Sequence, residues 1–582
     1  YRATPDLGLH QASLASNGDV VIKGISNTTD RPGVYIEVPV EATLGSVTVS
    51  GAGKLNGIKF DSGYSGIITA GAAVNLIGYS INGDAIYITK TGSPIISSGT
   101  GDITFSGYVE SGSSTMYGVY AASGVNISST SGNVVFQGSQ ISGISGTGST
   151  RLVNAATAST PVFPTADSAN MAYGASSGLN WAGNITVNTT NGYIQMGAKA
   201  PTVSGNMTAY GLSLVSSNQN YSFSGSNVIS TLAADIGSGS LTYSTTGVLN
   251  IGTLGVTTGI TAGSVTLTAA GLTDTADAGI TVTSSSTITI NNSSNSYDYS
   301  GVIAGPVAIT KSGNGSQTLS GANTYSGGTS ITGGTLISGA NTSAGPPSTG
   351  PFGTGTVTVA TGGSLDLNGK TISNALSVAG SGYSSGGVII NSNSQAGTAS
   401  GAITLTGSTY IGGAYNYTIS GAISGAYALT KVNTSNVITL SGNNLYSGGT
   451  TISEGILSIS SDGNLGAVPG SITANSINLN GGTLLATDNI TLNSNRGITL
   501  GASSTISVDS GDTLVYAGII TDGANSNSLT KAGAGTLKLA GANTYDGGTT
   551  ISNGTLGIYD NSSLGSGTLT FSGASNLLLG RA

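Results

Sequence analysis

The sequence predicts an all-β protein, a right-handed parallel β-helix (β-solenoid) that forms a single elongated rod. Three observations predict this fold: the composition, the recurrence of short alternating strands, and one long motif that occurs three times. Only 7% of the residues are charged and 95 are Gly, whereas Glu, which helices favour, is nearly missing. The abundant Thr, Ser, Val, Ile, Gly and Asn suit short strands that are separated by tight turns.

Apolar residues alternate with polar ones in short runs, as at residues 46–49 and 264–267. Alternation bounded by Gly or Asn is the signal of half-buried strands. Hydrophobic residues make up 37% of the chain and the mean hydropathy is +0.18, which argues against disorder. An array of β-sandwich domains is the structural alternative. It requires domains of about 100 residues that are joined by linkers, and the sequence shows no such linkers.

Residues 1–170 are predicted to form the first segment, in which solenoid rungs carry loops. The run at 101–107 recurs in similar form at 132–138. A repeat at this spacing fits one turn of a β-helix with a loop. Sequence rich in Pro and Ala interrupts the pattern around 155–178. We interpret this stretch as an inserted loop, and a linker is the alternative.

Residues 171–295 are predicted to form a second segment of solenoid rungs. Strand-like runs recur about every 8–10 residues, as at 240–244 and 259–267, with Gly or Asn between them. Rungs of roughly 20–25 residues, each with two or three short strands, would bury their inward side chains on neighbouring rungs. Gly and Asn at the corners supply the positive φ that sharp turns require.

Residues 296–582 carry the long motif three times, in segments at about 299–340, 417–460 and 516–560. Each copy has a Thr-Lys pair, an apolar strand, an Asn-x-Tyr-x-Gly-Gly-Thr turn and a second strand with Ile and Leu. Self-similarity of this kind marks a repeat architecture, in which each unit buries its apolar face on its neighbours. Variable rungs are predicted between the copies, because their spacing is unequal.

The motif resembles the passenger-associated transport repeat of bacterial autotransporters, also called the autotransporter-associated β-strand repeat. The copy at 529–558 shows this in its Leu-Thr-Lys start, its Asn-Thr-Tyr-Asp-Gly-Gly-Thr-Thr-Ile centre and its Gly-Thr-Leu end. The resemblance covers about half of the chain, from 299 to 582. Residues 231–268 are similar to repeats of large filamentous haemagglutinin-like adhesins. Both resemblances imply a secreted rod that is exposed on the bacterial cell surface.

The resemblance to autotransporters also implies a route of export. A passenger crosses the outer membrane unfolded and folds outside, rung by rung, with a membrane barrel or a secretion partner in the full-length system. A solenoid suits this route, since each rung needs only its neighbour to fold against. The sequence contains neither a signal peptide nor a C-terminal membrane barrel. We therefore expect an internal or processed piece of a longer polypeptide.

The composition argues against several classes of partner. A formal net charge of −8 and the lack of a basic run predict no nucleic-acid partner. No apolar stretch approaches the roughly 20 residues that span a bilayer, so we expect no membrane insertion by this segment. Because Cys is absent, a disulfide scaffold and a cysteine zinc site are excluded.

No residue is predicted to be catalytic, to bind a cofactor or to hold a metal, and the chain is not expected to be an enzyme. The one histidine, His10, is interpreted as a solvated terminal residue rather than a member of a catalytic triad. Lyase and glycosidase sites need clustered carboxylates. The nearest pairs are Asp274 with Asp277 and Asp509 with Asp512, which we interpret as solvated corners or weak Ca²⁺ sites.

The fixed Lys and Tyr of the motif are the remaining candidates. The lysines are predicted to lie at the surface or at a corner rather than in a ligand site; they are Lys311, Lys431 and Lys531. The tyrosines are predicted to pack over the Gly-Gly turns that follow them; they are Tyr325, Tyr446 and Tyr545. Exposed members of the 25 Tyr could instead stack on sugars.

From these observations we expect a non-catalytic, secreted surface rod with a structural or adhesive role. Neither end of the sequence looks like a polar cap, which suggests either a truncated fragment or a subunit that stacks end to end into an extracellular filament or matrix fibre. The alternatives are a carbohydrate-active enzyme or a carbohydrate-binding adhesin on the same scaffold. The expected partners are a second copy of the chain and glycans of the cell surface or matrix.

Overall fold

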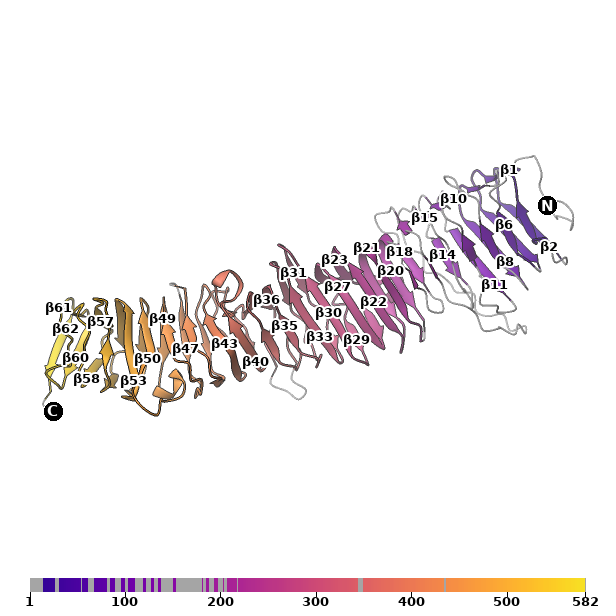
Figure 1. Ribbon diagram of the computed structural model, residues 1–582. Coiled ribbons are helices and arrows are strands. Elements are labelled where there is room, and N and C mark those ends of the chain that lie inside the picture. Colours follow the sequence, from indigo (N-terminus) through magenta and orange to yellow (C-terminus); the bar gives the residue numbers. More distant parts are fainter. Residues whose placement is uncertain are drawn as a thin grey trace. The chain divides into compact units, whose positions relative to one another are not determined.

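The computed structural model shows a parallel β-solenoid, which confirms the predicted fold class (Figure 1). The structure describes residues 14–580, apart from 27–30, 54, 61–66, 81–83, 89–95, 100–102, 110–118, 122–126, 130–133, 138–149, 153–179, 182–184, 188–192, 197–201, 204–206, 217, 344–348 and 434–435. The chain divides into two compact units. Unit 1 runs to residue 289 and includes 300–307, and unit 2 holds 290–299 and continues from 308.

The first coils of unit 1 have three sides, and each side is a parallel ladder with one strand per coil. One ladder comprises β1 (Leu14–Ser16), β4 (Val40–Ala42), β7 (Ile68–Ala70), β10 (Ile96–Ser98) and β13 (Ile127–Ser129). A second comprises β2 (Val20–Ser26), β5 (Val47–Gly53), β8 (Val74–Ser80), β11 (Ile103–Val109) and β14 (Val134–Gln137). The third comprises β3 (Val34–Ile36), β6 (Ile58–Phe60), β9 (Ile86–Ile88) and β12 (Val119–Ala121).

The recurrence seen in the sequence of unit 1 is one coil of the solenoid. Ile103 of β11 pairs with Val134 of β14, so the two similar runs lie on each other in register. The rung length predicted from the sequence is too short for this part. Val47 of β5, for example, pairs with Val74 of β8, and the coil between them is longer than the predicted rung.

The rest of unit 1 continues as parallel strands, with one antiparallel hairpin of β24 (Thr253–Leu254) and β25 (Thr257–Thr258). The earlier strands are β15 (Thr150–Leu152), β16 (Asn180–Trp181), β17 (Ile185–Val187), β18 (Tyr193–Met196), β19 (Thr202–Val203), β20 (Met207–Val215) and β21 (Tyr221–Asp235). The later strands are β22 (Ser240–Thr245), β23 (Val248–Ile251), β26 (Ile260–Ala262), β27 (Ser264–Ala269), β28 (Gly271–Asp274), β29 (Ile280–Val282), β30 (Ser286–Asn291) and β32 (Ile303–Ala304).

Unit 2 is built on four ladders, which we number by their order along the chain. Ladder 1 comprises β33 (Val307–Ser312), β35 (Thr329–Ile331), β37 (Val357–Val359), β40 (Leu376–Gly380), the first part of β43 (Ile403–Ile411) and β45 (Ile423–Ser424). Ladder 2 comprises β31 (Ser296–Tyr299), β34 (Ser316–Leu319), β36 (Gly334–Ser338), β38 (Gly363–Asp366), β41 (Ile389–Ile390), the last part of β43, β46 (Leu429–Lys431), β48 (Thr450–Ile452), β50 (Thr473–Asn480), β53 (Arg496–Ala502) and β56 (Ile520–Thr521).

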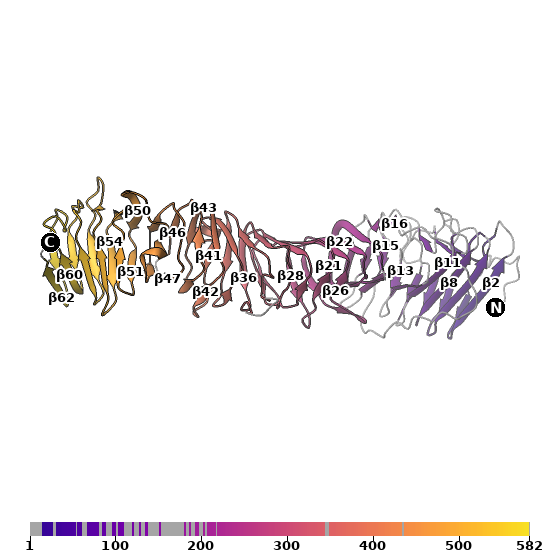
Figure 2. The ribbon, with the colours of Figure 1, turned by 90° about the horizontal axis from the view of Figure 1, so that it is seen from below.

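Ladder 3 comprises β39 (Thr371–Ile372), β42 (Gly397–Ala399), β44 (Tyr417–Ile419), β47 (Val437–Leu440), β49 (Ile456–Ile459), β51 (Thr483–Ala486), β54 (Ser504–Val508), β57 (Leu529–Ala532), β59 (Thr549–Ile551) and β61 (Leu569–Phe571). Ladder 4 comprises β52 (Ile490–Leu492), β55 (Thr513–Tyr516), β58 (Thr536–Leu539), β60 (Gly554–Ile558) and β62 (Ser575–Leu579). Figure 2 shows the paired strands β60 and β62 at the end of unit 2.

Inward Val, Ile and Leu fill the coils, and polar residues alternate with them on the outside. In β37, for example, Val357 and Val359 are buried, whereas Thr358 between them is exposed. This period of two is the pattern that the sequence predicted. Positive φ occurs at corner Gly and Asn residues, such as Gly449 (84°) and Asn433 (72°), which also agrees with the prediction.

The helices of the described part are two short 3-10 turns, η1 (Tyr383–Ser385) and η2 (Asp462–Leu465). Among the described residues, no helix has the length and apolar character that crossing a membrane requires. His10 and the whole stretch 155–178 lie outside the described residues. The division into segments 1–170, 171–295 and 296–582 stays a prediction.

Candidate functional site: buried polar residues of the three motif copies

Each motif copy spans two successive coils, because its first two strands pair with its last two. In the first copy β33 pairs with β35 and β34 pairs with β36, so that Lys311 faces Ile331. In the other copies Lys431 faces Ile452, and the equivalent lysine pairs in the same way. The predicted pair of strands in each copy is therefore part of a set of four.

The copies advance around the solenoid. The Thr-Lys strand lies in ladder 1 in the first copy (β33), in ladder 2 in the second (β46) and in ladder 3 in the third (β57). The second strand advances in the same way, from ladder 2 (β34) to ladder 3 (β47) and ladder 4 (β58). The chain between two successive copies therefore makes several complete coils and then covers one additional side of the solenoid.

The three motif lysines are fully buried at the ends of their strands. Nζ of Lys311 donates to two carbonyl oxygens of the turn that follows, at 2.7 and 2.9 Å, and to that of Gly333 in the next coil, at 3.1 Å. Lys431 and Lys531 make the same three bonds, at 2.7–3.2 Å. An ammonium group has three hydrogens, so each one meets a carbonyl oxygen. The lysine therefore ties its own turn to the next coil.

The predicted surface position of these lysines is wrong, whereas the predicted corner position agrees with the turn that each lysine bonds. A buried ammonium is unfavourable unless it is hydrogen-bonded, and the open carbonyls of two stacked turns provide its acceptors. Burial lowers the pKa of Lys311, Lys431 and Lys531 to about 8, and the charge of Glu454 partly opposes this for Lys431. At pH 7 the three groups are mostly protonated, and they titrate at mildly alkaline pH.

The free energy of unfolding should therefore rise between pH 8 and about 10. An unfolded lysine has a pKa of about 10.4, so above pH 8 the unfolded chain binds more protons than the native chain, and linkage stabilises the native state as pH increases. Burial raises the pKa of the motif tyrosines, so they oppose this rise only as pH approaches 10, where unfolded tyrosines with a pKa of about 10 lose protons that the buried ones keep. Urea titrations across this range measure the rise. Lys531→Met should reduce it by about a third, and an unchanged rise in that variant would contradict the assignment.

The motif asparagine connects three coils. Oδ1 of Asn444 accepts the N–H of Ile423 in the preceding coil at 2.8 Å, and Nδ2 donates to the carbonyl of Asn464 in the following coil at 2.6 Å. Asn543 makes the equivalent two bonds, at 2.8 and 2.6 Å. Asn323 donates the bond to the following coil at 2.8 Å. All three side chains are buried, so the amide replaces backbone bonds that the irregular turn cannot form.

The motif tyrosine lies on the buried side of the Gly-Gly turn, and its hydroxyl bonds to the threonine on the other side of that turn. Its hydroxyl lies 2.7 Å from Thr329 Oγ1 for Tyr325 and 2.6 Å from the equivalent threonine in the other copies. Between ring and threonine the chain turns at a glycine with positive φ, which is 82° at Gly328. The ring is fully buried in every copy. The predicted packing of the ring at the turn is confirmed, and burial raises the pKa of Tyr446 to about 12.

Removing this hydroxyl should destabilise the turn. Tyr446→Phe is expected to lower the local free energy of unfolding by about 1 kcal/mol, and Tyr446→Ala by about 3–5 kcal/mol because a cavity replaces the ring. Hydrogen exchange at residues 450–459 measures both effects. Tyr427 is 46% exposed and serves as the control, since Tyr427→Phe should change stability by less than about 0.5 kcal/mol. Equal effects of the two Phe variants would contradict the assigned role.

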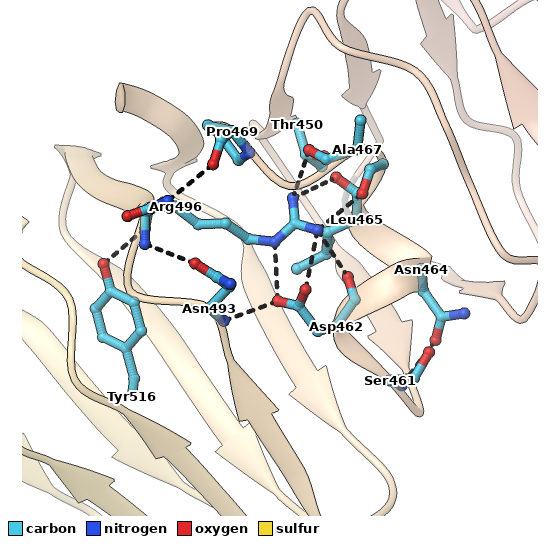
Figure 3. Close-up of polar contacts among 12 residues, drawn as sticks. Thr450, Ser461, Asp462, Asn464, Leu465, Ala467, Pro469, Asn493, Arg496 and Tyr516 are labelled. Carbon is cyan, nitrogen blue, oxygen red and sulfur yellow. Dashed lines mark hydrogen bonds and ion pairs between the residues drawn. The ribbon is translucent and has the colours of Figure 1, made fainter. Parts of the chain in front are cut away.

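Arg496 is fully buried in the coil after the second copy (Figure 3). Its Nε and Nη2 face the carboxylate of Asp462 at 2.8 and 3.1 Å. The guanidinium also donates to the carbonyls of Leu465, Gly466 and Ala467, at 3.1, 2.7 and 3.3 Å. Arg496 thus holds the turn that begins with η2 and satisfies carbonyls that have no strand partner.

Asn374 has the same role in the coil after the first copy. Its Nδ2 lies 3.3 Å from the carbonyl oxygen of Phe352 and 3.0 Å from those of Gly353 and Gly355. A Cβ at Gly353 would collide with the ring of Tyr325, as one at Gly466 would with the ring of Tyr446. The sequence analysis missed Asn374 and Arg496. The recurring Phe-Gly or Leu-Gly pair after each copy was the available signal for the turn that they bind.

The two aspartate pairs lie at turns, as predicted. Oγ of Ser300 lies 2.8 Å from Oδ2 of Asp274 and 3.0 Å from Oδ1 of Asp277, and its single hydrogen can serve one of them at a time. The N–H of Asp512 donates to the carbonyl of Asp509 at 3.1 Å. Over the part of the chain that the structure describes, no three His, Cys, Asp or Glu side chains gather to hold a metal. Calcium binding at these corners stays a prediction.

The fixed Lys, Asn and Tyr of the motif thus bond within their own turn or to the backbone of adjacent coils. Their chemistry is the joining of successive coils, which defines the class: a structural solenoid repeat.

Comparison with known proteins agrees with this class. The passenger-associated-transport-repeat family matches residues 309–337, 435–459 and 529–558. Over 211 residues the chain is 33% identical to the adhesin BmaC autotransporter of Brucella suis biovar 1 (strain 1330). That alignment covers 36% of this chain and 6% of the relative, so the chain spans a small part of that protein's length. No solved structure matches the chain.

The three copies are therefore passenger-associated-transport repeats, and the predicted resemblance to an autotransporter passenger is confirmed. The similarity to an autotransporter adhesin indicates secretion to the bacterial cell surface, as the sequence predicted. The similarity of residues 231–268 to filamentous haemagglutinin-like adhesins stays a prediction.

Proposed function

We propose that this chain is a non-catalytic part of an adhesive surface passenger, in which the repeats drive coil-by-coil folding outside the cell. One observation supports the proposal above all: the buried Asn and Lys of each repeat depend on adjacent coils for part of their hydrogen bonds. Until the next coil arrives, Asn444 lacks the carbonyl of Asn464 and Lys431 lacks its third acceptor. Each added coil provides the missing hydrogen-bond partner, so the folding of one coil makes the folding of the next more favourable.

Export provides the test of this proposal. The chain is placed between a signal peptide and an outer-membrane barrel, and surface display is measured by the access of an external protease. A variant with all three motif asparagines changed to Leu should reach the surface less efficiently than the original chain, because each coil then gains less when it folds. The matched control is Asn443→Leu, which alters an exposed neighbour of Asn444. Full display of the triple variant would refute the role of the repeats.

Adhesion is measured separately, as the attachment of displaying cells to host cells and to matrix proteins. Cells that display the chain should attach more than cells with the barrel alone, and no difference would argue against an adhesive role. The enzyme alternative is tested by incubating the chain with plant and bacterial polysaccharides and assaying reducing ends and unsaturated products. Release of either product would overturn the non-catalytic assignment.

Self-association belongs to this proposal as a finer prediction. In the filament hypothesis a second copy of the chain stacks end to end. Electron microscopy over a range of concentrations measures particle length. Lengths that increase with concentration support the filament, and discrete particles at every concentration would remove it.

A further inference from the structure

A column of hydroxyl side chains lies on the outer side of ladder 1 in unit 2. It has one residue per coil, in register: Thr310, Ser330, Thr358, Ser377, Thr404 and Ser424. All six are half-buried or exposed. Because paired strands lie about 4.8 Å apart, the column presents a hydroxyl at that interval along the axis of the unit.

Most hydroxyls of this column are available to a ligand. In the described part of the chain, the first five make no hydrogen bond to a protein group, and the last, Ser424, donates to the carbonyl of Ile403 at 3.4 Å. The neighbouring column, whose residues follow those of the first column by two positions, has hydroxyls that are already bonded. Thr332 and Thr406 there donate to carbonyls of the preceding coil at 3.3 and 3.2 Å. The first column therefore has hydroxyls that are available to a ligand, and the column beside it has hydroxyls that are bonded to backbone carbonyls.

The other two ladders that carry a Thr-Lys strand show the same pattern. On ladder 3 five threonines are in register; they are Thr483, Thr505, Thr530, Thr550 and Thr570. On ladder 2 the column holds the hydroxyls of Thr430, Thr451, Thr499 and Thr521, and the amide of Asn478 takes one position. Since Lys points inward, the Thr before it points outward. Because the copies advance by one ladder, each copy contributes its Thr to a different column.

We propose that these hydroxyl columns bind a neutral, extended polysaccharide that lies along the axis of the unit. The inference rests on the proposed role as a surface adhesin and names its ligand class. Sugar hydroxyls both donate and accept hydrogen bonds, as do those of Thr and Ser. The columns carry no charged side chain, and a net charge of −8 disfavours acidic polymers. One such bond gains little in water, but five or six on one polymer act together.

The length of the polymer gives the first test. Affinity electrophoresis of the full chain uses a soluble neutral β-glucan that is fractionated by length. Retention should increase with glucan length and vanish with a trisaccharide, because a short sugar reaches too few coils. Binding should also be insensitive to salt, since no ion pair forms. Equal retention by short and long glucans, or no retention, overturns the proposal.

The second test removes hydroxyls without changing side-chain shape. The triple variant Thr310→Val, Thr358→Val and Thr404→Val should weaken glucan binding about tenfold. The matched control is Thr332→Val with Thr406→Val, whose hydroxyls already bond to carbonyls, and it should retain binding. Circular dichroism confirms that both variants fold. Should the triple variant misfold, the ladder 3 variant Thr505→Val with Thr550→Val takes its place. Equal losses in variant and control overturn the proposal.

Two further outcomes would also overturn it. Salt-sensitive retention by a polyuronate, with none by the glucan, would assign the columns to an acidic polymer. Self-association of the chain in ultracentrifugation that disappears in the triple variant would assign them to a second copy.

Cell attachment separates this inference from the proposed function. If attachment persists in the triple variant and the glucan does not bind, the columns are not the adhesive surface and the adhesin role stands.

Discussion

Replacing Arg496 with Met lowers the local free energy of unfolding around residues 462–500 by about 3–5 kcal/mol. This is the expected result, because the guanidinium pairs with the carboxylate of Asp462 and also bonds to four backbone carbonyls of the turn. Removing it leaves a carboxylate without its counterion and carbonyls without donors. Met fills much of the volume of the Arg side chain, so the lost stability comes from the polar contacts and not from a cavity.

Hydrogen exchange of the whole chain measures this effect, since a solenoid opens locally rather than all at once. Exchange should accelerate around η2 and β53 and stay unchanged near β33 in the first copy. Asp462→Asn provides a graded comparison, because it keeps the acceptor and loses the charge on a side chain that is 21% exposed. Its effect should be about 1 kcal/mol. A loss as large as that of Arg496→Met would indicate that the ion pair alone holds the turn.

Replacing Asn444 with Leu should cost about 2–4 kcal/mol of local stability, because the N–H of Ile423 and the carbonyl of Asn464 both lose their partner. An unsatisfied buried polar group costs about 1–3 kcal/mol. The loss should spread over three coils, because the amide bonds to the coil before and the coil after.

The neighbouring residue provides a matched control for this prediction. Asn443 is exposed, and Asn443→Leu should change stability by less than about 0.5 kcal/mol. Hydrogen exchange at Ile423 and at residues 463–466 distinguishes the two variants. If faster exchange were confined to the coil of residue 444, the asparagine would not connect its neighbours as we describe.

Period-two alternation was enough to predict the solenoid, because each coil repeats the same inward and outward order. The same period places Lys311 on the side of Ile309, so the sequence held the signal that the lysine points inward. We predicted a position at the surface or at a corner instead, since a buried charge is rare without an evident partner. Its acceptors are backbone carbonyls, which no pattern of side chains reveals.

Arg496 and Asn374 show what could not be predicted. Each binds a turn of the preceding coil, Arg496 at Asp462 and Asn374 at Phe352. The separation along the chain differs between the two cases, because it depends on loop lengths that the sequence does not define. Neither residue belongs to the motif, so repetition gave no reason to select it.

The sequence alone was sufficient for the fold class, the repeats, the family resemblance and the surface location, because these depend on local periodicity and on a motif that recurs. Only the tertiary structure decided which coils the buried Lys, Asn and Arg connect, and that the three copies lie on successive ladders. The physical reason is register. A strand pairs with the coil above and below it, and variable loops determine which residues of those coils it meets.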